Sequence, residues 1–343
     1  MGKKIWLFLI VLVITAMVIS LGIGRYAMGL KEVSGIFLHA IGADGYLPAP
    51  AIQMQSVFWN IRLPRIIMSF IVGSGISIAG AVFQGIFRNP LASPDILGVT
   101  FGASFGAALA IVFVTQVTMG IQGCAFIFGI VAVFSTYFLG SRSWDKSAAV
   151  LVIAGIAVSA VFQAGLSLLM YIADPYDQLA KIYFWTMGSF QVASWSKIQI
   201  TLPIVIIGTA LLCIFSWRIN IMTLDEEEAL SLGINISRWR LFYIVISTLI
   251  VASAVAAVGS IHWLGLIVPH IARYLVGTEH RRLVPVTAVL GGAFLVLMDT
   301  MARSLLATEI PISIVTSIFG APFLGYLIIS RNRGGLKNGR ENC

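Results

Sequence analysis

The feature that most constrains this chain is a succession of apolar segments, most of them long enough to cross a lipid bilayer. The first, residues 5–23, contains nineteen residues and no charge. A helix of this length, rising about 1.5 Å per residue, spans a hydrocarbon core of about 30 Å. Nine more apolar segments follow, at 66–86, 97–117, 119–139, 148–173, 198–217, 241–258, 261–276, 284–306 and 310–329. We therefore predict an all-α polytopic membrane protein with about ten transmembrane helices.

Composition agrees with a single membrane domain. Hydrophobic residues make up 59% of the 343 residues and charged residues only 10%, which is far too apolar for one soluble core. No small-residue cleavage site follows the first segment, so we expect it to be retained as the first helix. We divide the domain, residues 1–343, into the first helix with an outer segment (1–60), a transmembrane core (61–330) and a cytoplasmic tail (331–343).

Basic residues are distributed unequally between the two ends of these segments. An even number of crossings places both termini on one side, and that side carries fifteen of the 22 lysines and arginines. By the positive-inside rule both termini are cytoplasmic, and the protein lies in the cytoplasmic membrane. This bias accounts for most of the formal net charge of +8. Nucleic acid is not expected as a partner, since no cluster of basic and aromatic residues forms a binding surface.

Residue types that commonly bind metals or form disulfides are scattered along the chain. Cys124 and Cys213 fall within predicted helices and Cys343 ends the chain, so we expect neither a disulfide framework nor a metal site. His270 follows Pro269 in VPHIAR, and a lone histidine near a helix end is more often a cap or an interface residue than a metal ligand. We expect no catalytic residue, because no predicted helix pairs a nucleophile with a base.

Small residues recur at intervals of four along two of the predicted helices. Gly98, Gly102 and Gly106 share one helix face, and Gly75 and Ala79 do so on the preceding segment. Such faces let two helices approach closely. We favour tight packing within one subunit over a dimer interface, although small-residue faces serve both purposes.

A run of four acidic residues stands out in so apolar a chain, in TLDEEEALSLGI. Thr223 and Glu226 have the spacing of a capping box, and the acids Asp225–Glu228 suit the first turn of a helix, where the dipole favours negative charge. Gly233 suits the C′ position, where a left-handed conformation ends a helix. We predict a short helix at 224–232, about 13 Å long and too short to span a bilayer.

This acidic helix lies in a cytoplasmic loop, because Arg238 and Arg240 follow it. A solvated connector is the simplest interpretation of a charge run. A connector needs only a few residues, however, whereas this helix has its own caps and apolar residues with which to pack, namely Leu224, Ala229, Leu230 and Leu232. We therefore favour a docking helix for a cytoplasmic partner.

Asp299 is the one acidic residue that we place well inside a predicted helix. An acid within the membrane is a functional candidate, and one that carried protons would make the protein a proton-coupled secondary transporter. Arg303 lies four residues further along the same helix face, where the two side chains can pair. We favour this structural pairing, because proton relays usually combine several ionisable groups.

Four stretches resemble the permease subunits of type II ABC importers, the FecCD-like family for iron-siderophores, haem and cobalamin. They are RLPRIIMSFIVGSGISIAGAVFQGIFRNPLASPDILGVTFGA (62–103), LDEEEALSLGI (224–234), GLIVPHIARYLVGTEHRRLVP (265–285) and EIPISIVTSIFGAPFLGYLI (309–328). FRNPLASPD and VPHIAR, in this order and separation, are highly specific. The resemblance implies a ten-helix permease that assembles with a second permease, identical or homologous, two cytoplasmic ATPase subunits and an extracytoplasmic substrate-binding protein.

The resemblance also gives the acidic helix a role. The matching segment of the family is the coupling helix, which sits in a cleft of the ATPase and transmits its opening and closing to the membrane helices. Acids on this helix can meet basic residues on the ATPase surface, each exposed pair contributing about 0.2–1 kcal/mol. The residues that we assign to this coupling role are Asp225, Glu226, Glu228, Ala229, Leu232 and Gly233.

Three arginines at the outer side break the positive-inside rule. They are Arg62 and Arg65 in RLPR, and Arg303. Snorkelling to lipid phosphates would explain a single outer arginine. The resemblance implies instead that all three face outward and dock the substrate-binding protein through salt bridges to its glutamates.

The family's cytoplasmic gate matches Ser147, Ala148 and Ala149 at the start of the fifth predicted helix. The neighbouring sequence SRSWDK departs from the family's pattern.

We predict the transmembrane permease subunit of an ATP-driven importer that carries an iron(III)-siderophore across the cytoplasmic membrane. The chain is not expected to be an enzyme: it lacks the pattern G-x-x-x-x-G-K-[ST], so a separate subunit hydrolyses ATP. No cofactor is expected in this chain, since the partner ATPase binds ATP and Mg. Haem or cobalamin is the alternative cargo, and a proton-coupled secondary transporter using Asp299 is the alternative of another class.

Overall fold

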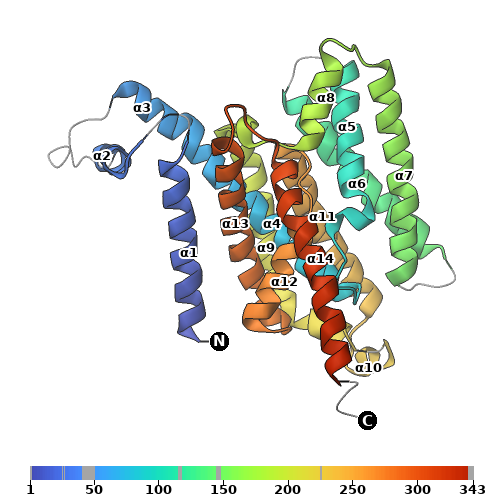
Figure 1. Cartoon of the computed structure of the whole chain (residues 1–343). Coiled ribbons are helices and arrows are strands. Elements are labelled where there is room, and N and C mark those ends of the chain that lie inside the picture. Colours follow the sequence, from blue (N-terminus) through green and yellow to red (C-terminus); the bar gives the residue numbers. More distant parts are fainter. Residues whose placement is uncertain are drawn as a thin grey trace.

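The computed structural model describes residues 2–24, 26, 28–40, 51–114, 118–143, 148–224 and 226–338. Every regular element in this part of the chain is helical (Figure 1). The long or apolar helices are α1 (Lys3–Gly22), α4 (Leu63–Ile86), α5 (Val99–Phe113), α6 (Thr118–Ser141), α7 (Ala148–Ile172), α9 (Trp195–Met222), α11 (Ile236–Val258), α12 (Leu264–Val276), α13 (His280–Ser304) and α14 (Ile312–Asn338).

These helices correspond one to one to the apolar segments predicted from the sequence. Among the described residues, 7 helices are long and apolar enough to cross a membrane, and three more are shorter apolar helices, at Val99–Phe113, Leu264–Val276 and Ile312–Tyr326. The N-terminal end of α1 and the C-terminal end of α14 lie at the same end of the bundle (Figure 1). The all-α fold with both ends on one side is therefore confirmed.

Helix α4 lies at the centre of the bundle. It packs against α13, α11, α9 and α12. In the most apolar stretch of its helical segment, 89% of the residues are buried, whereas the corresponding share in the peripheral α1 is 17%. Gly75 explains part of this close packing: a Cβ atom there would lie only 2.7 Å from Cγ2 of Ile250 on α11. The predicted close approach of helices at Gly75 is confirmed.

The second predicted small-residue face joins α5 to α6. A Cβ atom on Gly102 would overlap with the backbone of Phe128, and one on Gly106 would overlap with the backbone of Cys124. Packing within one subunit, the favoured interpretation, is thus what the structure shows. Gly98 differs from the prediction, because it precedes α5 with a left-handed φ of 83° and ends a turn of 3-10 helix at Pro94–Leu97.

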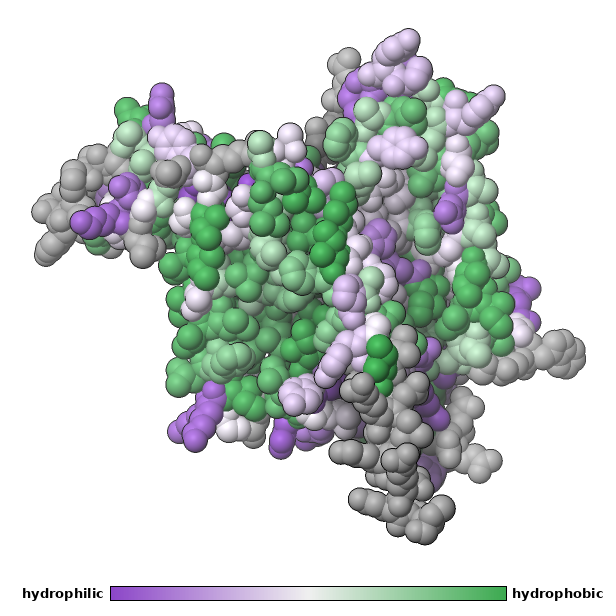
Figure 2. All heavy atoms as spheres, in the orientation of Figure 1, coloured by the Kyte–Doolittle hydropathy of each residue, from purple (hydrophilic) through white to green (hydrophobic). Residues whose placement is uncertain are grey.

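Apolar side chains remain exposed on the outside of the bundle. Hydrophobic residues cover the face that α1 and α13 present in Figure 2, and hydrophilic residues gather at its upper and lower ends. Helix α7 exposes Ile153, Ile156, Val161 and Leu168. Exposed apolar faces of this extent suit lipid or a neighbouring membrane subunit.

Several short elements were not predicted. They are α2 (Leu30–Ala40), α3 (Ile52–Val57), a π-helical stretch (Phe58–Arg62), α8 (Gln178–Met187) and a turn of 3-10 helix (Phe190–Val192). The π-helical stretch continues directly into α4, so Arg62 and Arg65 belong to one continuous helical segment. Helix α14 extends to Asn338, so the first part of the predicted tail is helical.

Candidate functional site

The outer end of α4 carries a buried ion-pair cluster centred on Arg65. The guanidinium group binds Asp299 of α13 in a bidentate manner, with Nε 2.9 Å from Oδ2 and Nη2 2.8 Å from Oδ1. Nη1 donates to Oε2 of Glu309, also at 2.9 Å. Arg65 is 7% exposed and Asp299 is 1% exposed. This geometry joins α4, α13 and the segment after α13 through charge-assisted hydrogen bonds.

The other two outer arginines bind the end of α1. Arg62 donates to the carbonyl groups of Leu21 and Tyr26. Arg303 donates to the carbonyl group of Ser20 and, at 2.8 Å, to its hydroxyl oxygen. Because backbone carbonyls at a helix C-terminus lack helical partners, these two arginines cap α1 and bring it against α4 and α13.

Two predictions about this cluster are changed by the structure. The predicted pair of Asp299 and Arg303 is present, but Nε of Arg303 lies 3.9 Å from Oδ2, so Arg65 is the closer partner. The expectation that three guanidinium groups face outward is wrong, because Arg62, Arg65 and Arg303 are only 4%, 7% and 6% exposed. The reason is physical: each finds carbonyl or carboxylate oxygens inside the protein.

Glu309 is a member of the cluster that sequence reasoning missed. Its signal was its place in ATEIP, immediately after the helix that contains Arg303. Nothing in a linear sequence, however, indicates which of several arginines a loop acid will bind.

At the cytoplasmic end, α10 (Glu226–Ser231) is the predicted acidic helix. Gly233 follows it with φ of 75°, and the amide of Ile234 donates to the carbonyl of Ala229 at 3.0 Å. This is the hydrogen bond of a Schellman motif, so the predicted role of Gly233 as terminator is confirmed. Asp225 lies outside the described residues.

The predicted start of the acidic helix is wrong. The helix begins at Glu226 rather than at 224, and Thr223 is not its N-cap. Thr223 instead ends α9, and its hydroxyl donates to the carbonyl of Asn220 at 2.6 Å. Since α9 is longer than predicted, the hydroxyl satisfies a carbonyl of that helix instead of an amide of the next one.

Helix α10 presents different residues to the bundle and to the cytoplasm. Ala229 is fully buried, whereas Glu228 and Leu232 are exposed. Two residues beyond the end of α4, Arg88 adopts a left-handed φ of 49° and donates from Nε to the carbonyl of Met222 at 3.1 Å. It also donates to the carbonyl of Leu224. Arg88, which the sequence did not single out, thus ties the end of α4 to the entrance of α10.

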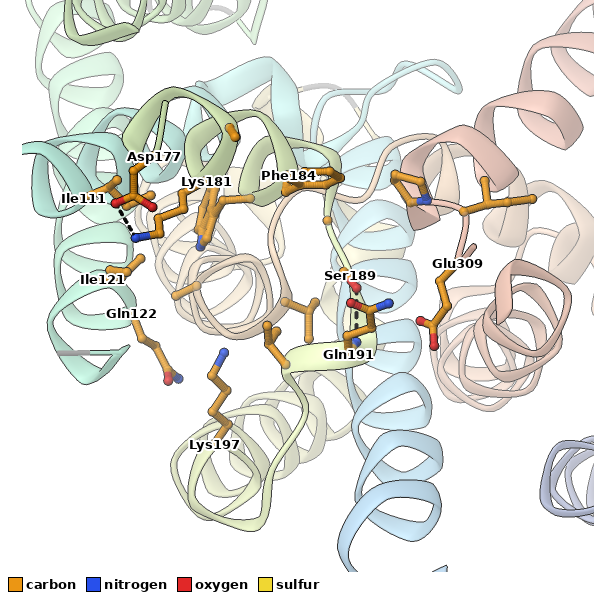
Figure 3. A pocket seen from close by; sticks show the side chains of 18 of the residues that line it. Ile111, Ile121, Gln122, Asp177, Lys181, Phe184, Ser189, Gln191, Lys197 and Glu309 are labelled. Carbon is orange, nitrogen blue, oxygen red and sulfur yellow. Dashed lines mark hydrogen bonds and ion pairs between the residues drawn. The ribbon is translucent and has the colours of Figure 1, made fainter. Parts of the chain in front are cut away.

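A cavity of about 480 Å³ lies at the opposite end of the molecule, beside α8. We call it the outer cavity; α5, α6, α8, α9, α11 and the segment after α13 line it. Its polar side chains include Gln122, Asp177, Lys181, Lys197 and Glu309 (Figure 3). Sequence reasoning missed the outer cavity, because its lining comes from six separate parts of the chain.

The predicted gate is described only in part. Ala148 and Ala149 form the first turn of α7, at the cytoplasmic end of that helix. Ser147 lies outside the described residues. The gating role stays a prediction.

The fold and these sites define a polytopic α-helical transport subunit of the cytoplasmic membrane. The chain matches the model of the FecCD transport family over residues 11–330. The chain belongs to this family, whose members are permease components of ABC importers for metal-chelate substrates. The resemblance and the multi-pass membrane location predicted from the sequence are both confirmed.

Similar proteins cover nearly the whole chain. The molybdate import system permease protein MolB of Haemophilus influenzae is 41% identical over 327 residues, 95% of each chain. The cobalamin import system permease protein BtuC of Halobacterium salinarum is 37% identical over 308 residues, covering 85% of this chain and 83% of its own. A solved structure described as an inward-facing metal-chelate type ABC transporter is 38% identical, with a TM-score of 0.86, covering 96% of this chain and 100% of its own.

Proposed function

We propose that this chain is the membrane subunit of an ATP-driven importer that carries an iron(III)-siderophore into the cytoplasm. The observation that carries the proposal is the geometry of α10, a short helix with exposed Glu228 and Leu232, closed by Gly233. It sits at the cytoplasmic end of the bundle (Figure 1). A short, exposed helix that packs against α9 and α11 is a suitable contact for a moving cytoplasmic partner.

Coupling would run through Arg88. Arg88 donates hydrogen bonds to the carbonyl groups of Met222 and Leu224, just before α10. If the ATPase displaces α10, these hydrogen bonds would transmit the movement to Arg88. Because Arg88 follows α4, the central helix of the bundle, the same displacement reaches the core helices. ATP and Mg would be bound by the ATPase subunits, and this chain would supply no cofactor site and no catalytic residue.

The names of related permeases support iron complexes as the cargo. Relatives of this chain are named as permeases for molybdate, cobalamin, hemin, iron(3+)-hydroxamate and Fe(3+)-citrate. Iron complexes are named most often among them, and this supports an iron(III)-siderophore. Molybdate, haem and cobalamin are the competing cargoes that an experiment must include.

The assembly would contain a second permease, two ATPase subunits and a substrate-binding protein. We propose that the binding protein docks at the outer ends of α4 and α13, near Arg62, Arg65 and Arg303. Since these guanidinium groups are buried in the permease alone, direct salt bridges to the partner require them to turn outward on docking. Until then, they hold α1, α4 and α13 together.

A proton-coupled transporter that uses Asp299 is less well supported. Its carboxylate accepts three hydrogen bonds from Arg65, with Arg303 also nearby. These contacts tie Asp299 of α13 to Arg65 of α4, and a structural ion pair of this kind accounts for a buried acid without a proton relay.

Uptake by cells that contain or lack this chain would test the proposal. Cells would receive iron-55 bound to a siderophore, labelled haem, labelled cobalamin or labelled molybdate at equal concentrations. The proposal predicts that loss of the chain abolishes iron-siderophore uptake and that plasmid-borne chain restores it. A Gly233→Val chain, present at the same level in the membrane, serves as the matched control. Loss of molybdate, haem or cobalamin uptake alone would contradict the iron assignment.

A further inference from the structure

Lys197 places a buried cation in the outer cavity. It belongs to the first turn of α9 and is only 8% exposed. Its Nζ atom donates to the carbonyl of Ala257, near the end of α11, at 2.9 Å. No carboxylate pairs with Lys197 among the residues that the structure describes. Buried lysines are normally paired, because an ammonium group loses much solvation energy on leaving water.

The other charges at the outer cavity are already matched. Asp177 and Lys181 bind each other at 2.6 Å on the exposed rim. Glu309 binds Arg65 at 2.9 Å. Among the described residues that line the cavity, the charge that remains without an oppositely charged partner is the positive charge of Lys197.

Gln122 supplies a buried side-chain oxygen without a hydrogen-bond partner among the described residues. It lies on α6, it is 7% exposed, and its Oε1 atom has no hydrogen-bond partner in the described part of the chain. Both residues line the outer cavity, and Figure 3 shows Gln122 extending from α6 and Lys197 from α9. An amide group can turn end for end and present two N–H donors to a ligand in place of its oxygen.

The shape of the outer cavity suits a ligand. Its volume of about 480 Å³ lies within the range of small-molecule sites, about 300–1,000 Å³. The walls include Ile111, Phe184 and Trp185, so polar groups are few and concentrated. Tyr176, at the rim, is 94% exposed, which leaves the cavity open at the outer end of the molecule.

We propose that the outer cavity binds an anionic oxygen group of the cargo, either a carboxylate of a metal chelate or a free tetrahedral oxyanion. Lys197 supplies the charge and two N–H donors beyond the one held by Ala257, and Gln122 supplies the facing amide. The inference rests on the proposed import function and narrows its cargo to anions. A role for Lys197 as a cap of α11 alone would account for the bond to Ala257, but for neither the cavity nor the unpartnered side-chain oxygen of Gln122.

Binding to the purified full-length chain tests this site without ATP, so its outcome is independent of whether the ATPase proposal holds. The probes are molybdate as a free oxyanion, ferric citrate as a carboxylate chelate and an uncharged ferric hydroxamate. The variants are Lys197→Met, Lys197→Arg and Gln122→Leu. Arg282→Met, which removes an exposed cation that is paired with Glu279 outside the outer cavity, is the matched control.

We expect the affinity for the anionic probes to depend on the positive charge at position 197. Lys197→Met should raise the Kd of at least one anionic probe about tenfold or more, while Lys197→Arg and Arg282→Met stay within about threefold of the wild-type chain. Gln122→Leu should raise the same Kd by a smaller factor. Whichever of molybdate and ferric citrate responds identifies the source of the anionic group.

Three outcomes would overturn the proposal. One is an unchanged Kd for both anionic probes in Lys197→Met. Another is an equal loss of binding for the anions and the uncharged hydroxamate, which would indicate a structural role. The third is weaker binding of the cargo-free delivery protein with unchanged anion binding, which would make Lys197 a partner contact.

Discussion

Replacing Arg65 with methionine should destabilise the protein more than any other single loss of charge at its outer end. Methionine keeps the apolar stem but removes the donors to Asp299 and Glu309. Asp299 is 1% exposed and would keep only Arg303, whose Nε lies at 3.9 Å. Breaking a buried ion pair on one side costs about 3–5 kcal/mol, because an uncompensated charge remains buried.

The measurement is the free energy of unfolding of the purified protein, titrated with sodium dodecyl sulfate and followed by circular dichroism. We expect Arg65→Met to lose about 3–5 kcal/mol. Asp299→Asn, combined with it, should cost less than the sum of the two single changes by about 1–3 kcal/mol, since the double variant leaves no unpaired acid at position 299.

Lys181→Met is the matched control for this cycle. This change also breaks an ion pair at the outer end of the molecule. Both side chains of the Lys181–Asp177 pair, however, are about 60% exposed. Exposed pairs contribute about 0.2–1 kcal/mol. If Arg65→Met costs no more than Lys181→Met, or if the two changes in the cycle are additive, the outer cluster does not hold the helices together as described.

Further predictions concern the coupling helix and the helix packing. Gly233→Val should uncouple ATP hydrolysis from uptake, because a β-branched residue resists φ of 75° by about 1–2 kcal/mol; ATPase activity per molecule of transported cargo measures this, and an unchanged ratio would contradict it. Arg88→Ala should lower cargo-stimulated ATPase activity at least about threefold while the chain still reaches the membrane, since each lost charged hydrogen bond is worth about 1.5–3 kcal/mol. Gly102→Leu should reduce the amount of folded protein on size-exclusion chromatography, whereas Gly123→Leu, with open space around its Cβ, should not.

Much of the fold was predictable because the bilayer imposes a simple rule on sequence. Apolar segments of the necessary length are visible without any knowledge of contacts, and the distribution of basic residues sets their orientation. Gly102 and Gly233 were also predictable, since small residues at intervals of four and a glycine after a helix have local causes.

Contacts between distant parts of the chain were not predictable in this way. Arg65 and Asp299 are 234 residues apart in sequence, so the local spacing favoured Arg303 as the partner of Asp299. Thr223 has the spacing of a capping box, but α9 extends through Met222 and takes its hydroxyl. Arg62 and Arg303 were predicted to face outward because they stand at the outer ends of helices. The sequence does not show the carbonyl groups at and after the end of α1 to which both side chains donate.

The most direct test of the account is the energy source of transport. The purified permease would be reconstituted in liposomes with its ATPase and the loaded delivery protein, with ATP supplied on the ATPase side. We predict that uptake of the iron-siderophore requires ATP hydrolysis, persists when an uncoupler abolishes the proton gradient, and is lost when Gly233→Val replaces the wild-type chain. Uptake that proceeds without the ATPase and collapses with the uncoupler would contradict the account.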